Sequence, residues 1–200
     1  LRVDHSSEVA SKIDAQCSLV DQGCKTPFSV SFICGNAGQE MLHDLLLVDT
    51  LLARKIKNVP DALKMRRHVI CKCTLHLPEH PTLCSHATSS DVSKHLGQLC
   101  AGGVNKTPAV RALGERLQTY YAEGRLILKP NTFWCHGTSL TVLPKTLQAS
   151  FKNDFIVFIK GDTNYRRLLR DSTEWLPDAS IADVSAGFPG SFALCSLLFA

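Results

Sequence analysis

The sequence predicts a three-layer α/β fold, with a mostly parallel sheet, flanking helices and a Rossmann-like core. Apolar stretches of strand length alternate with longer segments whose apolar residues recur every three to four positions. Half of a βαβ unit is visible at residues 28–52, where an apolar stretch, the turn 35–38 and a helical period follow one another. Two hundred residues suffice for one such domain, and we expect a single domain over residues 1–200.

The first half of the chain supplies four of the expected elements. An Asp4, Ser6 and Ser7 group can cap a short helix that carries Val9 and Ile13, because these side chains accept hydrogen bonds from helix N-termini. A buried strand at 28–34 follows, and the next strand is expected at 68–75. Between these strands a helix carries apolar residues from Met41 to Leu52, and its last turns hold cations that suit the helix dipole, Arg54, Lys55 and Lys57.

The second half continues the alternation. A proline-rich stretch at 78–81 precedes a helix that Ser89, Ser90 and Asp91 cap. Thr107-Pro108 has the cap-then-proline order of a helix start, and that helix ends at Gly124. The remaining expected elements are a strand at 126–128, a loop at Phe133-Trp134, a strand at 155–159, a helix that starts at 166–170 and a buried strand at 192–199.

Composition places the chain among ordinary globular proteins. Its formal net charge of +4 is small and its basic residues are interleaved with acids, so we expect no nucleic-acid partner. No segment resembles a membrane span or a signal peptide, so we expect no membrane partner. Nine cysteines occur without a C-x-x-C pair, which favours reduced, buried thiols and a cytoplasmic location.

Several cysteines and histidines leave alternatives open. The segment from Cys71 to His86 has the atoms of a zinc site, but its spacing fits no common zinc pattern. Cys71 and Cys73 would share one face of a strand, which suits a metal as well as two buried small side chains. Cys34, at a strand end, is a candidate nucleophile. The histidines expected at the surface or in packing roles are His43, His95 and His136.

Three polar segments carry most of the chemistry, namely Cys34 to Leu45, Leu83 to Thr88 and Lys160 to Arg166. The last follows a buried strand, and the strand ends of an open α/β sheet are where its ligand site lies. In order and spacing the three segments resemble the damage-control phosphatase family, most closely its sugar-phosphate branch. The matching segments Phe133-Trp134, Trp175-Leu176-Pro177 and Leu194 to Leu197 extend the resemblance over nearly the whole chain.

The resemblance implies a divalent metal: manganese, cobalt, nickel or magnesium. The family has an Asp-Asn pair at the first strand end, and here Asn36 matches the asparagine while Gly35 leaves the aspartate position vacant. His86 stands at the position of the third family ligand, also an aspartate. Because hard cations prefer anionic oxygen ligands, the loss of two carboxylates predicts weak metal binding. A histidine at position 86 still suits nickel, cobalt or zinc.

The resemblance also implies a substrate site. The expected contacts to phosphate and sugar are Asp162, Thr163, Asn164, Tyr165 and Arg166. Arg166 brings a planar cation that suits phosphate, and Asp162 and Asn36 are the expected catalytic residues. Leu198 stands where the family has the arginine of a later Arg-Thr-Leu-Lys segment, and the family's N-terminal helical region is missing. We therefore expect a core that is truncated at both ends.

Together these features predict a metal-dependent phosphatase for small sugar phosphates of the fructose 1-phosphate type, with impaired activity. The alternative is a catalytically inactive relative or fragment that retains phosphate binding, and a small zinc-binding protein is a distant third. Both of the first two would bind a small phosphorylated metabolite. Glu40 and Asp44, four residues apart on one helix face, either organise the metal site or complement the helix dipole.

Overall fold

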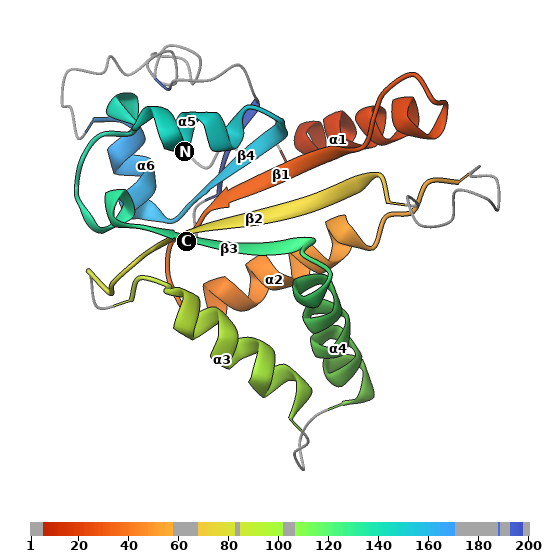
Figure 1. Ribbon diagram of the computed structural model, residues 1–200, viewed down its shortest axis with the longest axis horizontal. Helices are drawn as coiled ribbons and strands as arrows, with labels where there is room; N and C mark the ends of the chain where they lie inside the picture. The colour runs from red at the N-terminus through yellow and green to blue at the C-terminus, as the bar shows by residue number, and fades with distance from the viewer. Residues whose placement is uncertain are drawn as a thin grey trace.

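The computed structural model describes residues 6–57, 68–82, 85–101, 107–170, 188 and 193–197. Within this part of the chain, five strands form one sheet in the order β3-β2-β1-β4-β5 (Figure 1), and every neighbouring pair is parallel. The predicted α/β class with a parallel sheet is therefore confirmed. The strand order is the one found in doubly wound folds.

Helices and strands alternate along the chain as the sequence predicts. The strands are β1 (Phe28–Ile33), β2 (Ile70–Pro78), β3 (Leu126–Asn131), β4 (Asp154–Lys160) and β5 (Ala193–Leu197). The helices are α1 (Ser6–Asp21), α2 (Gln39–Leu52), α3 (Ser89–Cys100), α4 (Pro108–Ala122), α5 (Lys145–Phe151) and α6 (Asp162–Leu168), with the short 3-10 helices η2 (Thr132–Cys135) and η3 (Leu140–Val142). None of the described helices is long and apolar enough to cross a membrane.

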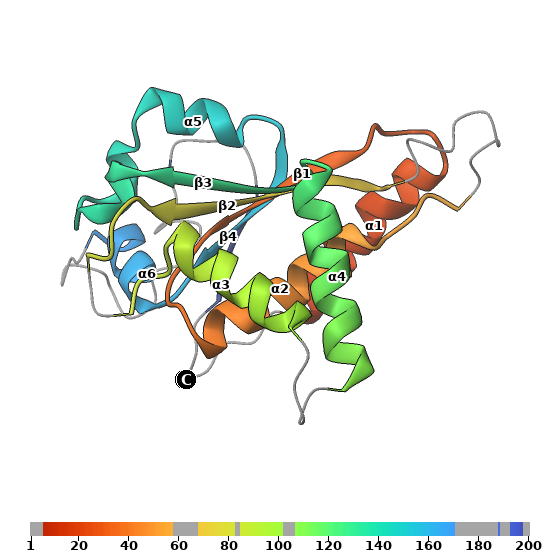
Figure 2. The same ribbon diagram turned by 60° about the horizontal axis from the view of Figure 1, so that its bottom comes forward.

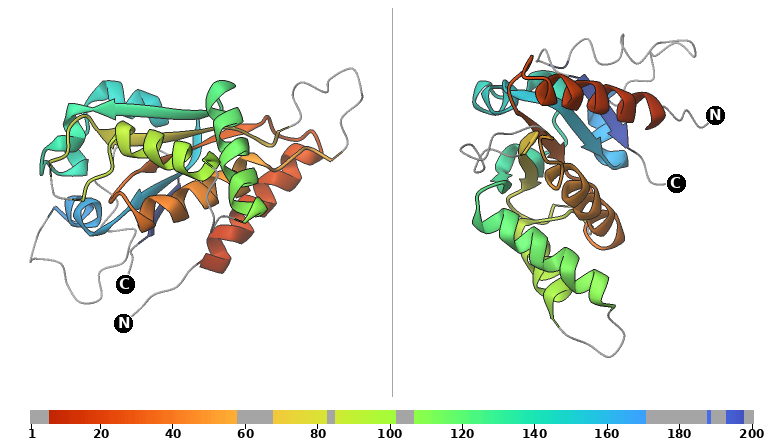
Figure 3. Two further views of the ribbon diagram at one scale, coloured as in Figure 1. Left: turned by 90° about the horizontal axis from the view of Figure 1, so that it is seen from below. Right: turned by 90° about the vertical axis from the view of Figure 1, so that its right-hand side faces the viewer.

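The sheet is covered on both faces, and each face has its own apolar core. Phe32 lies in the core that α1 to α4 complete, whereas its neighbour Ile33 lies in the core of η2, η3, α5 and α6. Figure 2 shows α2, α3 and α4 on one side of the sheet and α5 on the other, and α3 and α4 pack against each other at the outside of their layer (Figure 3). Burial on both faces explains why the strands are apolar along almost their whole length.

Several predicted boundaries are wrong. α6 begins at Asp162, so the segment expected as a loop before residue 166 is the first turn of a helix. α2 ends at Leu52, so Arg54, Lys55 and Lys57 follow the helix instead of occupying its last turns. Arg54 forms an ion pair with Asp14 of α1 instead. Neither α5 nor η3 was predicted from the sequence, and the expected cap at Asp4 lies outside the described residues.

Asp154, the first residue of β4, makes stability depend on pH. Burial raises the pKa of its carboxyl to about 6, so the folded chain holds a proton that the unfolded chain releases between about pH 4 and pH 6. The free energy of unfolding should therefore fall as the pH rises through this window. We expect Asp154→Asn to remove this contribution, so that the stability of the variant relative to wild type increases from pH 4.5 to pH 7. Urea denaturation at both pH values measures the difference, and an unchanged difference would contradict this prediction.

Candidate active site at the carboxyl ends of β1 and β4

The two central strands of the sheet, β1 and β4, end beside each other. The chain winds from β1 toward β2 and β3 on one side, and β5 follows β4 on the other, so the strand order reverses between β1 and β4. Open α/β sheets place their ligands in the crevice outside the strand ends at this reversal. Gly35 follows β1 here and Gly161 follows β4.

The two glycines let the backbones approach closely. A Cβ placed on Gly35 would lie 2.9 Å from the carbonyl oxygen of Lys160 and 3.2 Å from the Cα of Gly161. Gly161 itself has φ +81°, a conformation that strongly favours glycine. The two backbone segments therefore approach each other closely, and the Glu40 carboxylate lies beside both glycine positions.

The second polar segment joins the first across this crevice. Asn36 and His86 form an isolated antiparallel bridge, which backbone hydrogen bonds from Ala37 to Ser85 (2.7 Å) and from Ala87 to Gly35 (3.0 Å) flank. The bridge places His86 beside the end of β1. All three polar segments named in the sequence analysis therefore meet at the carboxyl ends of the central strands.

Asn164 connects the third segment to the other two. Its buried amide nitrogen donates hydrogen bonds to the carbonyl oxygens of Cys34 (2.8 Å), the residue after β1, and Lys160 (3.0 Å), the last residue of β4. Its amide oxygen accepts a hydrogen bond of 3.3 Å from Arg167. Asn164 therefore fixes the start of α6 against both central strands.

Residues 1–200 match the model of the damage-control phosphatase ARMT1-like domain. The chain belongs to this family. It is also similar to the damage-control phosphatase ARMT1 of Danio rerio, with 27% identity over 198 residues, which are 98% of this chain and 40% of that relative. The chain thus spans two fifths of the relative's length. The family resemblance that the sequence analysis stated is confirmed, and members of this damage-control phosphatase family are generally metal-dependent.

The described donors do not make up the metal site of the family. Position 35 offers no side chain, and both amide atoms of Asn36 are engaged, because Oδ1 accepts from Ser85 (2.8 Å) and Nδ2 donates to Glu40 (3.0 Å). Asp162 is exposed at the start of α6. In the described part of the chain, no three His, Cys, Asp or Glu side chains lie together as metal ligands would. This donor set does not fit magnesium or manganese.

A buried ion pair lies next to the crevice. Lys160 Nζ and Asp44 Oδ1 are 3.0 Å apart, with 5% and 2% of their side-chain surfaces exposed. Burial raises the pKa of Asp44 to about 6 although Lys160 opposes the shift. Glu40 is also buried, and its Oε1 has no hydrogen-bond partner among the described residues. Asp44 therefore serves as the partner of Lys160, which is neither of the two roles expected for it, organising the metal site or complementing the helix dipole.

The expected substrate residues occupy different environments along α6. Asp162 and Arg166 are exposed, and Thr163 and Tyr165 are half-buried. Asn164, in contrast, is only 5% exposed and its amide faces the protein. The structure thus leaves four of the five expected contacts accessible.

Burial and geometry argue against the two cysteine alternatives, a nucleophilic Cys34 and a zinc site in the segment from Cys71 to His86. Burial, with a smaller contribution from Asp44, raises the pKa of the Cys34 thiol well above its usual value, so this thiol is a poor nucleophile. A bulge between β1 and β2 skips Cys71, which is exposed, whereas Cys73 is fully buried. His76 lies between the rings of Phe151 and Trp134, and burial lowers its pKa to about 3. The described part of the predicted zinc segment therefore does not converge, and Cys84 lies outside the described residues.

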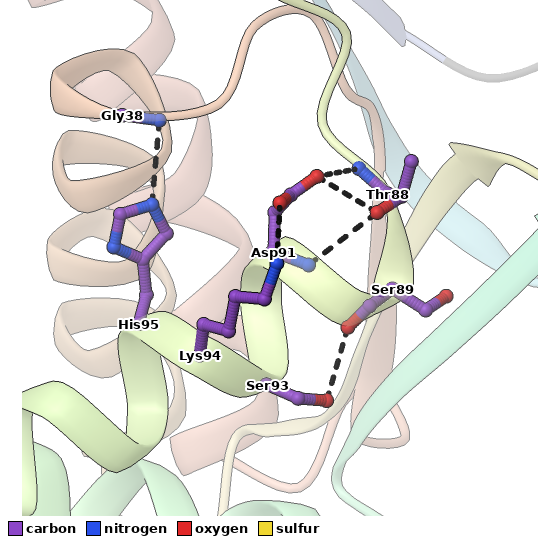
Figure 4. Close-up of polar contacts among 7 residues, drawn as sticks. All are labelled: Gly38, Thr88, Ser89, Asp91, Ser93, Lys94 and His95. Atoms are coloured by element: carbon purple, nitrogen blue, oxygen red, sulfur yellow. Dashed lines mark hydrogen bonds and ion pairs between the residues drawn. The ribbon is translucent and has the colours of Figure 1, made fainter. Parts of the chain in front are cut away.

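Two residues near the crevice were missed by the sequence analysis. His95 of α3, expected at the surface or in packing, accepts a hydrogen bond of 3.3 Å from the backbone N–H of Gly38 at the start of α2 (Figure 4). The same view shows how the side chains of Thr88 and Asp91 cap α3. Arg167 of α6 is 6% exposed. The i+3 spacing of Asn164 and Arg167 on one helix was the available signal for this second residue.

Proposed function

We propose that this chain binds a small sugar phosphate of the fructose 1-phosphate type at the crevice, and that its metal-dependent hydrolysis of the ester is impaired. The observation that carries the proposal is the meeting of the three family segments, through the approach of Gly35 to Gly161 and the bridge between Asn36 and His86. A ligand at this point would lie at the reversal of strand order, where open α/β sheets bind phosphorylated molecules.

The accessible side chains of α6 support the binding half of the proposal. Asp162 and Tyr165 offer hydrogen-bonding groups for sugar hydroxyls, and Arg166 offers a cation for phosphate. Asn164 acts by holding α6 on the ends of β1 and β4 rather than by touching the ligand. We expect impaired hydrolysis because two carboxylate metal ligands of the family are missing. Gly35 has no carboxylate at one of these positions, and His86 replaces the aspartate at the other.

The experiment measures binding and phosphate release separately. Fructose 1-phosphate is offered with Mn²⁺, Co²⁺ or Ni²⁺, and we expect calorimetric binding with phosphate release at least roughly 100-fold below that of an active phosphatase. Asp162→Ala should weaken binding. Glu8→Ala, which removes another exposed acid from the first turn of a helix, serves as its control. The absence of binding by the wild-type chain would overturn the proposal.

A second candidate is an active metal-dependent phosphatase, and one observation favours it. Glu40 Oε1 is a buried carboxylate oxygen without a hydrogen-bond partner among the described residues, and such an atom could accept a cation. Robust phosphate release that needs Mn²⁺ and vanishes in Asp162→Ala would support this candidate against the impaired one.

We also propose an intracellular, reducing location, because the seven cysteines whose side chains the structure describes are all free thiols.

A further inference from the structure

Arg167 is a buried cation whose hydrogen-bond partners are all neutral. Its Nε donates to the carbonyl oxygen of Thr138 (2.8 Å), Nη2 to that of Phe133 (3.3 Å) and Nη1 to the amide oxygen of Asn164 (3.3 Å). No ion pair joins it to an acid within the described residues. Burial alone lowers its pKa to about 10, which still leaves the guanidinium charged at neutral pH.

A buried charge without a counter-ion is costly. Removing a cation from water costs several kcal/mol, and proteins usually offset this cost with a carboxylate or a bound anion. The rings of Phe133 and Trp134 offset part of it, since the guanidinium carbon lies 5.0 Å and 5.5 Å from their centroids. A guanidinium has five N–H groups, and three are engaged, so two remain without an acceptor in the described part of the chain.

The position of Arg167 ties this charge to the crevice. Asn164, which accepts from Arg167, also donates to the strand-end carbonyls of Cys34 and Lys160. His86 is bridged to Asn36 beside the end of β1. A single hydrogen-bonded residue, Asn164, therefore separates the guanidinium of Arg167 from the ends of both central strands.

We propose that Arg167 binds the phosphoryl group of the ligand directly, so that sugar-phosphate binding by this chain needs no divalent metal. The inference rests on the proposed function, because it assumes that a phosphate monoester enters this crevice. The fixed positive charge of Arg167 would compensate the two negative charges of the phosphate monoester. It would do so in place of a metal ion, which the altered ligands of this chain do not fit. A guanidinium suits this role because its fork of donors matches the oxygens of phosphate.

The first test compares phosphate binding with and without a chelator. Fructose 1-phosphate and inorganic phosphate are titrated into the wild-type chain in EDTA and in Mn²⁺. We expect equal dissociation constants for fructose 1-phosphate under both conditions, and weaker binding of inorganic phosphate. Binding that disappears in EDTA would overturn the inference but leave the proposed function intact. No binding of either ligand under any condition would overturn both.

The second test uses a matched pair of arginines. Arg125 also donates to two backbone carbonyls, of Leu52 and Ile70, and its guanidinium stacks on Tyr120 at 4.9 Å, but it precedes β3 at the opposite end of the sheet. Arg167→Lys and Arg125→Lys should both lower the melting temperature. Only Arg167→Lys should weaken metal-free binding, by roughly tenfold or more. Equal affinities in the two variants would show that Arg167 is purely structural.

A third variant distinguishes direct phosphate binding by Arg167 from binding through a metal ion, and it leaves Arg167 unchanged. His86→Asp adds a carboxylate near the guanidinium at a half-buried position, and it also restores a family metal ligand. Direct binding predicts that His86→Asp weakens metal-free affinity several-fold through competition for Arg167. A gain in affinity that appears in His86→Asp and depends on Mn²⁺ would overturn the inference.

Discussion

Asp44→Asn should lower the free energy of unfolding by about 3 kcal/mol. The change keeps the shape of the side chain but removes its charge, and it leaves the ammonium of Lys160, with 5% of the side chain exposed, without its carboxylate partner at 3.0 Å. Removing the carboxylate of a buried ion pair is among the more destabilising single substitutions. Urea denaturation at pH 7.5, above the raised pKa of Asp44, measures the loss.

The matched control is another ion pair of the same fold. Arg116 and Asp49 are 2.7 Å apart, but 47% of the arginine side chain is exposed, so Arg116→Ala should cost less than about 1 kcal/mol. The double variant Asp44→Leu with Lys160→Met should recover most of the stability, because it removes both charges together. Equal losses for Asp44→Asn and Arg116→Ala would contradict the assignment of a buried, costly pair.

Gly35→Asp, which restores the aspartate of the family, should destabilise this chain by about 2 kcal/mol without restoring hydrolysis. The new Cβ would lie 2.6 Å from Glu40 Oε1 and 2.9 Å from the carbonyl oxygen of Lys160. The glutamate can move, but the carbonyl belongs to the backbone of β4. The β1 and β4 ends must therefore separate to admit the side chain.

Gly97→Ala is the control for this substitution. Gly97 lies within α3, and a Cβ there meets no atom within 4 Å, so we expect a gain of about 0.5–1 kcal/mol from helix propensity. Thermal unfolding of both variants, with and without Mn²⁺, gives the readout. A Gly35→Asp variant that is as stable as wild type and gains stability from Mn²⁺ would show that the crevice readily accepts a metal.

The sequence predicted the sheet well because a strand that is buried on both faces is a nearly continuous apolar stretch, which is easy to recognise. β1 and β4 are short, largely apolar stretches, and all residues of β1 and the last five of β4 are buried in the structure. α5 escaped prediction because its seven residues bury only Leu147 and Phe151, which is too little to establish a helical period. The start of α6 was misplaced because Gly161-Asp162-Thr163-Asn164 has the composition of a turn.

The site was predictable in outline and not in detail. Strand ends and the family resemblance located all three segments, but they did not reveal which side chains of these segments are exposed and which are buried. Consecutive helical residues point in directions about 100° apart, so Arg166 is exposed while Arg167 is buried beside Asn164. The bulge that turns Cys71 away from Cys73 likewise depends on the partner strand, which a local pattern does not contain.

The pairing of β1 with both β2 and β4 has a consequence for how the chain folds. Residues 28–33 meet residues 70–76 on one edge, but their other edge pairs only with residues 154–159. During synthesis the second edge stays open until residues 154–159 have left the ribosome, and open strand edges promote association between nascent chains. We expect docking of β4 to limit the folding rate, since it must close the longest loop in the sheet.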